Sequence, residues 1–465
     1  MQQEHAALNL KPLEALIVTL IILGGISYSI IFAGAVPHIP VVFAIMGLIA
    51  YGLIKKVSIA QLEKGLIEGA QSGLGAIFIF FLIGMLISSW MASGTIPTFI
   101  YMALEAVNGK FFYAIVFVVA SVIGMSIGSS LTTAATLGVA FMGVSSALGL
   151  SDAITAGAVI SGAFFGDKMS PLSDTTNLAS STVKVDLFEH IKTMAWTTIP
   201  SFIISLAIFA VLSPGEAASD FSKIAQLKKT LLDEGLVHWY SLIPFVILTI
   251  MAIKKVSAII TLSAGILSAL ILAIFVQNSF GFEKVMSLLY SGYASKSGSE
   301  EIDALLSRGG MESMMFSISL VLLALSMGGL FLKLGILPAL LEGIKGVLNR
   351  VSALVAAAAG TAIGINFLLG EQYLSILLTG NAFREPFEKA GLHPKNLSRI
   401  LEDAGTVVNP LVPWSVCGVF LTGVLGVETA AYLPFAFFCI LSPVITLIYG
   451  FTGLKIEKIE KKAAV

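Results

Sequence analysis

Charged side chains are scarce in this sequence. Only 12% of the 465 residues are Asp, Glu, Lys or Arg, and 57% are hydrophobic, whereas about a quarter of the residues of a soluble protein are charged. This shortage excludes a soluble globular fold and indicates a polytopic membrane protein. Apolar runs of the length that crosses a bilayer, on the order of 20 residues, recur along the whole chain. Examples are 15–36, 73–92, 191–212, 258–277 and 431–450.

Residues typical of other functional classes are also missing. The only cysteines, Cys417 and Cys439, lie in apolar runs, so neither a disulfide framework nor a cysteine metal site is expected. The net charge of −1 offers no basic surface for nucleic acid. All five histidines fall at predicted termini or helix ends, where none would act as a buried base. No HExxH or P-loop pattern occurs. We therefore expect no enzyme activity and no cofactor.

The two halves of the chain resemble each other weakly. SGTIP and LGILP place Gly94 and Gly335 241 residues apart, and the segments that begin at Gly128 and Gly370 align at an offset of 242. SPLS and VPWS match at the same offset, 170 against 412. Matches in one register predict two structural repeats, a plan typical of secondary transporters. The predicted boundaries are residues 1–212 for the first membrane repeat, 213–237 for a linker and 238–465 for the second.

The topology depends on two apolar arms, within 111–148, that flank Gly128. If they form a re-entrant hairpin, each repeat has five crossings, and an odd number inverts the second repeat. The prediction is an all-α membrane protein with about ten transmembrane helices, two re-entrant hairpins and helices broken at the midplane. With both termini in the cytoplasm, this topology places Lys254, Lys255 and the lysine-rich tail inside. Counting the hairpins as crossings would put the two lysines outside.

The segment GDKMSPLSDTTN, residues 166–177, interrupts an apolar run. Pro171 cannot donate a backbone hydrogen bond and disfavours helix at Ser170, which predicts a broken helix. An ionisable side chain near the bilayer centre costs about 2.5 to 3.5 kcal/mol, so it indicates function. Oxygen-rich side chains at a break suit a hard cation, which predicts a cation and proton site. Alternatively, Asp167 and Lys168 form a local ion pair, and 173–177 only caps a helix.

The second repeat has a matching break. VNPLVPW, residues 408–414, carries two prolines and follows LEDAGT. Adjacent helical residues point about 100° apart, so we expect one of Glu402 and Asp403 to face the cavity and the other a basic partner such as Arg399. The predicted hairpin tips carry Ser129 and Ser130 in the first repeat, and Glu371 and Gln372 in the second. Inverted repeats would bring both tips and both breaks together. Glu371 could instead serve only at a helix N-terminus.

GAFFGDKMSPLSDTTNLA, residues 162–179, together with residues 370–420, resembles the NhaC-type sodium/proton antiporters. That family belongs to the ion-transporter superfamily of inverted repeats and also contains malate/lactate antiporters. The resemblance implies exchange of sodium for protons by alternating access across a prokaryotic inner membrane. The cation- and proton-binding residues that it implies are Asp167, Ser173, Asp174, Thr175, Asn177, Glu371, Glu402, Asp403 and Thr406. Asp174 and Asp167 are the first choices for the carboxylates that bind sodium, and Lys168 for their charge partner.

Two other interpretations stay open. A sodium- and proton-coupled exchanger of malate and lactate would hold a carboxylate at half-helix N-termini, aided by Lys168 or Arg384. An intramembrane hydrolase would use Asp167 and Asp174, but the sequence reads FFGD at 164–167 where such proteases have GxGD. The expected partners are sodium, protons and the lipid bilayer. Malate or lactate and a second copy of the chain, in a homodimer, are further candidates, and nucleic acid is not.

Overall fold

A computed structural model of the chain describes residues 6–106, 111–214, 228–277, 281–295, 306–344 and 350–459, together with Asp303. Helices make up nearly all of the regular structure in these ranges, where the one β-bridge joins Leu392 to Lys458. Most of the predicted linker, 215–227, lies outside the described residues. The all-α fold class is confirmed.

Within the described residues, seven helical segments are long and apolar enough to cross a membrane. They are α1 (Pro12–Ile31), α4 (Leu74–Ala92), α7 to α8 (Ser130–Ala147), α11 (Leu187–Leu212), α14 (Ala258–Val276), η3 to α17 (Glu312–Lys333) and α19 (Val351–Leu369). Two bent pairs raise the number to nine: Pro394–Leu411 with Val416–Leu425, bent by 46°, and Thr429–Phe435 with Phe437–Thr452, bent by 59°. The prediction was about ten. Three apolar helices are shorter, α2 (His38–Ile54), α6 (Phe112–Ile127) and η2 to α13 (Trp239–Ile253).

Corresponding segments of the two halves have the same local structure. α10 (Asp174–Thr182) and α22 (Val416–Leu425) begin 242 residues apart, and each is capped by a serine, Ser173 or Ser415, whose hydroxyl accepts a backbone N–H. Gly128 and Gly370, also 242 residues apart, both adopt left-handed backbone angles, with φ of 71° and 69°, after α6 and α19. Glycine adopts this conformation without the steric cost that a Cβ brings.

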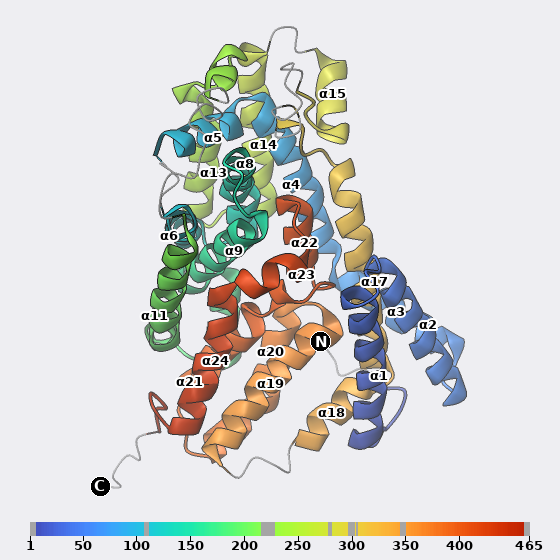
Figure 1. Cartoon of the computed structure of the whole chain (residues 1–465). Helices are drawn as coiled ribbons and strands as arrows, with labels where there is room; N and C mark the ends of the chain where they lie inside the picture. The colour runs from blue at the N-terminus through green and yellow to red at the C-terminus, as the bar shows by residue number, and fades with distance from the viewer. Residues whose placement is uncertain are drawn as a thin grey trace.

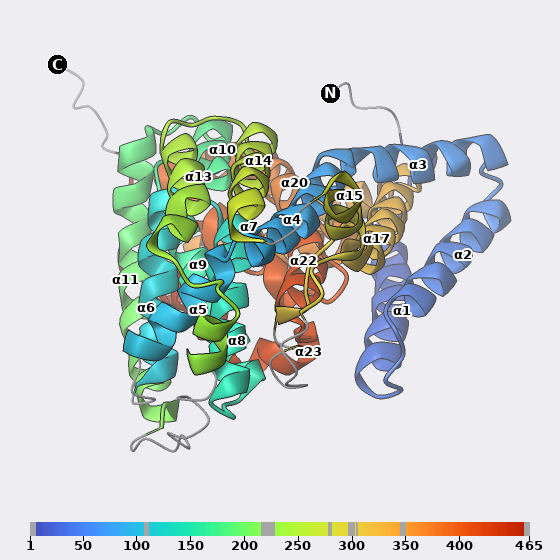
Figure 2. The ribbon, with the colours of Figure 1, turned by 90° about the horizontal axis from the view of Figure 1, so that it is seen from above.

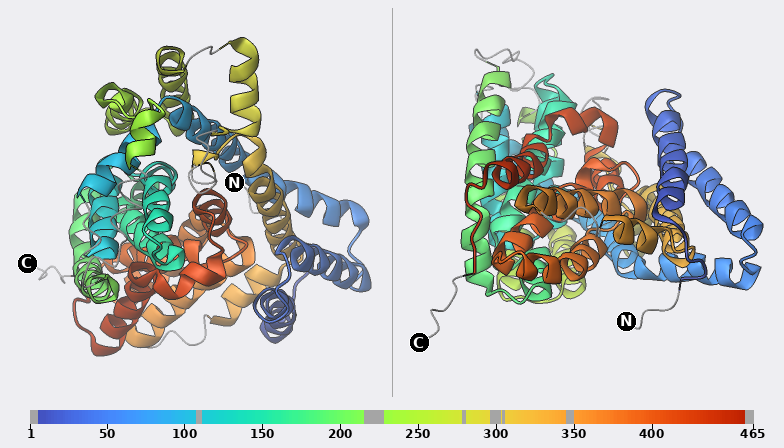
Figure 3. Two further views of the ribbon diagram at one scale, coloured as in Figure 1. Left: turned by 45° about the horizontal axis from the view of Figure 1, so that its top comes forward. Right: turned by 90° about the horizontal axis from the view of Figure 1, so that it is seen from below.

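The helices form a central bundle and two lateral bundles (Figures 1 and 2). The first lateral bundle combines α1, α2 and α3 (Ile59–Ser72) with α17 (Met315–Lys333) and α18 (Ile336–Ile344). The second combines α4 and α5 (Thr95–Ala106) with α13 (Ile243–Ile253), α14 and α15 (Phe282–Ser291). The central bundle contains α6 to α11, including α9 (Asp152–Met169), and α19 to α24. The bounds of the helices not yet given are Gln372–Lys389 for α20, Pro394–Ile400 for α21, Thr429–Tyr432 for α23 and Phe437–Thr452 for α24. Each lateral bundle therefore mixes helices from both halves of the chain. Figure 3 shows α1 to α3, in blue, at one side of the molecule.

The first lateral bundle is held by an unusually close helix crossing between α3 and α17. A Cβ built on Gly329 would lie 2.1 Å from the carbonyl oxygen of Gly65, and one on Gly69 would lie 2.2 Å from that of Leu325. Small residues allow membrane helices to approach this closely, so that van der Waals packing replaces the missing hydrophobic driving force. The crossing therefore requires glycine on both helices.

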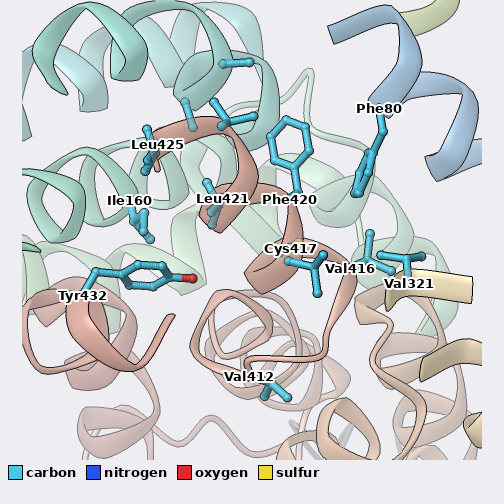
Figure 4. Packing of buried hydrophobic residues seen from close by; sticks show 14 of the residues in the cluster. Phe80, Ile160, Val321, Val412, Val416, Cys417, Phe420, Leu421, Leu425 and Tyr432 are labelled. Atoms are coloured by element: carbon cyan, nitrogen blue, oxygen red, sulfur yellow. The ribbon is translucent and has the colours of Figure 1, made fainter. Parts of the chain in front are cut away.

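Apolar side chains surround the half-helix α22, as Figure 4 shows. Phe420 packs against Phe80 of α4 with ring centroids 4.9 Å apart, and Val416 and Val321 lie side by side. Tyr432 lies next to the second break, where its hydroxyl donates to the carbonyl of Pro410 at 2.6 Å. Irregular backbone at membrane depth is tolerated where protein covers it. The second break is therefore covered by protein rather than by lipid.

Candidate functional site

The first helix break lies where the sequence predicts it. α9 (Asp152–Met169) ends before Ser170, which is extended with ψ of 129°, and α10 begins at Asp174. The side chain of Asn177 donates to the carbonyls of Pro171, at 3.0 Å, and Ser173, at 2.7 Å. Thr176 Oγ1 similarly donates to the carbonyl of Lys168 at 3.1 Å. Polar side chains of the motif therefore satisfy the backbone that the break exposes.

The second break is stabilised by two asparagines that the sequence analysis missed. Asn409 donates through Nδ2 to Oδ1 of Asn366, at 2.8 Å, and its own Oδ1 accepts the N–H of Cys417, at 2.9 Å. Asn366 Nδ2 donates to the carbonyl of Gly405 at 2.6 Å. Both side chains are fully buried. An amide in an apolar run such as 351–369 was the available signal, since a polar group at that depth needs a partner.

The tip of the first predicted hairpin contacts the end of α9. The backbone N–H and the hydroxyl of Ser130 both donate to Oδ2 of Asp167, at 3.1 and 2.6 Å. Asp167 is only 5% exposed. Two donors from the start of a helix favour negative charge at this position. The structure thus joins the tip and the break of the first half, as the sequence predicts.

Lys168 forms an ion pair with Asp403, and neither side chain is exposed. Thr197 donates to Oδ1 of Asp403 at 3.1 Å, and Thr446 donates to Oδ2 at 2.5 Å. Asp403 therefore has a partner on each oxygen. The sequence analysis expected a partner such as Arg399, and this was wrong. Arg399 is also buried, but it donates to the carbonyl of Lys455 at 3.0 Å.

Glu402 is in the opposite situation to its neighbour. It lies in η5, a π-helix spanning Leu401–Thr406, and is fully buried. Neither of its carboxylate oxygens makes a hydrogen bond of regular geometry. The hydroxyl of Thr406, which also makes no regular hydrogen bond, lies close enough to interact with this carboxylate. Asp167 and Lys168 lie within electrostatic range of Glu402. The two adjacent acids of LEDAGT thus differ as expected: one is paired with a cation and one is not.

Glu371 caps the N-terminus of α20 (Gln372–Lys389), where its side chain accepts the N–H of Leu374 at 2.8 Å. This capping role is the alternative that the sequence analysis left open. Asp167, Asp174 and Glu371 all lie within electrostatic range of Tyr373. Acidic residues of both halves therefore lie around Tyr373.

Asp174 is exposed, unlike the other site carboxylates. It lines a pocket of about 320 Å³ together with Ser129, Thr132 and Lys255. The hydroxyl groups of Ser173 and Thr175 lie behind it, 3.1 Å apart. Asp174 thus lies at an access route rather than in the buried cluster.

His190 was not expected at the site. It lies in the first turn of α11 but is fully buried, with Nδ1 2.8 Å from the hydroxyl of Ser398. Its other ring nitrogen has no partner. The position of His190 at the end of a helix suggested an exposed side chain. The side chain is buried because α21 (Pro394–Ile400) covers this turn of α11.

In the described part of the chain, no three His, Cys, Asp or Glu side chains are grouped closely enough to hold a metal ion by themselves. Sodium would therefore need hydroxyl or carbonyl oxygens besides one or two carboxylates. Such oxygens are abundant at both breaks, and hard cations accept them.

Comparisons with known proteins agree with this chemistry. The model of the Na+/H+ antiporter family matches residues 162–454. The Na(+)/H(+) antiporter NhaC of Alkalihalophilus pseudofirmus is 42% identical over 91% of both chains. The arginine/ornithine antiporter ArcD of Halobacterium salinarum is 39% identical over 85% of this chain and 82% of its own. The malate-2H(+)/Na(+)-lactate antiporter of Bacillus subtilis is 32% identical over 85% of both chains.

The family match spans both helix breaks and every acidic residue of the site, and the relatives cover most of the chain. All of these relatives are antiporters by name. The chain belongs to the Na+/H+ antiporter family.

Proposed function

We propose that the protein exchanges sodium for protons across a prokaryotic plasma membrane, as a secondary transporter that uses no cofactor and catalyses no covalent chemistry. The names of its NhaC relatives support this function. Exchange would proceed by alternating access, with the two repeats, 1–212 and 238–465, in inverted orientation and both termini in the cytoplasm. The recurrence of caps and left-handed glycines at an offset of 242 residues supports this organisation.

The observation that carries the proposal is an imbalance of buried charge. The buried side chains of the described residues include four carboxyl groups and two basic groups. They are Asp167, Glu371, Glu402, Asp403, Lys168 and Arg399. Isolated charge in a low-dielectric interior is strongly unfavourable. The two excess negative charges must be neutralised, and small cations and protons are the ligands that can do so inside a closed cluster.

The same imbalance argues against an organic anion as the principal substrate, because a further carboxylate would add to the excess. Malate and lactate, the substrates in the name of the Bacillus subtilis relative, are therefore an alternative to be tested. Arginine and ornithine, in the name of the Halobacterium salinarum relative, carry a net positive charge, so the imbalance does not argue against them and they are tested as well. The intramembrane hydrolase is not favoured either, since Asp167 is held by Ser130 and Asp174 lies exposed in the pocket.

The test is proton movement in proteoliposomes that enclose a pH dye, with sodium added outside. Simple antiport predicts alkalinisation of the interior without any organic substrate. Glu428→Gln, at an exposed position without a capping bond, should behave like the wild type. Proton movement only in the presence of malate with lactate, or of arginine with ornithine, would overturn the proposal.

A further inference from the structure

Glu402 and Asp403 are neighbours in sequence but have opposite surroundings. The carboxylate of Asp403 has a cation and two hydroxyl donors. The carboxylate of Glu402 is equally buried, and neither oxygen makes a hydrogen bond of regular geometry. An ionised carboxylate without a partner is not stable in such an environment. Glu402 must therefore carry a proton or bind a cation whenever the surrounding structure is closed.

Two buried threonine hydroxyls near the second break make no regular hydrogen bond. Thr406, four residues after Glu402, has its hydroxyl close to the carboxylate, and Thr379 lies on α20. Threonine hydroxyls inside helices usually donate to a backbone carbonyl of the preceding turn, as Thr136 and Thr182 do. Two hydroxyls that make no such bond are therefore available to a ligand.

Thr379 follows Ser375 by four residues on α20, which places it on the same helix face, and Ser375 lies against η5. A Cβ on Gly380, the next residue, would lie 3.1 Å from the side chain of Leu401, and a Cβ on Gly405 would lie 3.2 Å from the hydroxyl of Ser375. The segments 375–380 and 401–405 therefore run past each other at close range, with Glu402 between these two contacts. A π-helical turn such as η5 is rare and often marks a functional position.

We propose that Glu402 is the carboxylate that exchanges a proton for a sodium ion, and that Thr406 and Thr379 supply neutral oxygen ligands. This inference rests on the proposed function and specifies which group performs it. Sodium displaces the acidic proton of Glu402, which passes to water, and the net charge of the site is unchanged. The Lys168–Asp403 ion pair stays intact and acts as a positioning element. Asp167 and Asp174, the first choices from the sequence, serve the hairpin tip and the access pocket.

The first test uses the unmodified protein and dicyclohexylcarbodiimide, which reacts with protonated carboxylic acids in apolar surroundings. The acid oxygen adds to the carbodiimide carbon while the acid proton passes to a nitrogen, and rearrangement gives a stable acylurea. Peptide mass spectrometry should locate the adduct at Glu402. Sodium at about ten times its Kd should slow labelling about tenfold, and the same concentration of choline should not. Labelling at another carboxylate alone, or labelling of Glu402 without protection by sodium, would overturn the assignment.

The second test compares sodium binding and proton release in detergent. Wild-type protein should release protons when sodium is added, and its sodium Kd should rise about tenfold for each pH unit of acidification in the range where Glu402 is protonated. Glu402→Gln, which mimics the protonated acid, should lose both effects while retaining its fold. Thr379→Val should weaken sodium binding by about three- to tenfold, the effect of losing one oxygen contact. Glu428→Gln is the matched control.

The outcomes separate the two proposals. If the wild-type protein neither binds sodium nor releases protons, the proposed function fails. If the wild type does both and Glu402→Gln still does both, only the assignment to Glu402 fails.

Discussion

Lys168 and Asp403 are 235 residues apart in the sequence and form an ion pair with no exposed surface. The pair joins the end of α9 to the π-helix η5, so it connects the two broken helices directly. Phe438 adds a cation–π contact, with Lys168 Nζ 5.6 Å from the ring centroid. Every oxygen of Asp403 is satisfied, which favours a fixed structural role for this pair.

Removing one partner of the pair should destabilise the protein strongly. Lys168→Met leaves a buried carboxylate without its cation, and such losses cost about 3 to 5 kcal/mol. The expected result is a large decrease in thermal stability in detergent, followed by tryptophan fluorescence. The double variant Lys168→Met with Asp403→Leu should regain much of this stability, because neither charge remains buried. Wild-type stability of the single variant would contradict the fixed pair.

Asp174→Asn should weaken sodium uptake without abolishing it. The side chain is exposed in the 320 Å³ pocket, where the charge attracts cations across solvent. We expect the KM for sodium to increase about two- to fivefold, in line with the weak electrostatics of exposed groups, and high salt to reduce the difference. Lys255→Gln, on the same pocket, should lower the KM. Complete loss of exchange would place Asp174 among the direct ligands.

Gly329→Ala should disrupt the first lateral bundle. The new methyl group would lie 2.1 Å from the carbonyl oxygen of Gly65, a backbone atom that cannot rotate away. Overpacking of this kind costs about 1 to 3 kcal/mol, which size-exclusion chromatography and thermal unfolding should detect. Gly360→Ala is the control, since nothing lies within 4 Å of the added atom. Equal stability of the two variants would argue against the close crossing.

Asn409→Ala should destabilise the second break. It removes the acceptor of the Cys417 N–H and the donor to Asn366, and each buried polar group left unpaired costs about 1 to 3 kcal/mol. Unfolding in a denaturing detergent should begin at a lower concentration than for the wild type. Asn396→Ala is the comparison. The Asn396 side chain forms two hydrogen bonds with the backbone of Glu457 and none with the second break that the structure records. That variant should leave sodium exchange intact.

The helix breaks were predictable because their signal is local. Proline restricts its own backbone and that of the preceding residue, and α9 ends at Met169, directly before Ser170 and Pro171. The all-helical fold followed from composition alone. The partner of Asp403 was not predictable in the same way. Arg399 is one helical turn away and was the obvious candidate, whereas Lys168 reaches Asp403 only through the packing of two distant helices. The unpaired state of Glu402 follows from the same packing.

The sequence analysis also missed buried polar side chains that carry no charge. Asn366 and Asn409 lie in apolar surroundings, and their mutual hydrogen bond depends on where α19 meets the second break. The spacing of residues along the sequence does not show which residue of α19 lies beside which residue of the second break. The π-helical turn at 401–406 likewise has no recognised sequence signature. The sequence therefore predicted that Glu402 and Asp403 point in different directions, but not which of the two has the cationic partner.

The mixed composition of the lateral bundles has a consequence for biosynthesis. α1, α2 and α3 pack on α17 and α18, and α4 packs on α14 and α15. When the first half of the chain has entered the membrane, its early helices still lack these partners, which the ribosome has yet to synthesise. The second lateral bundle cannot be completed before residues 243–291 have emerged, and the first cannot be completed before residues 315–344 have emerged. A chain truncated in the 213–237 region should therefore remain an open set of inserted helices, and co-expression of the missing half should be required to complete both bundles.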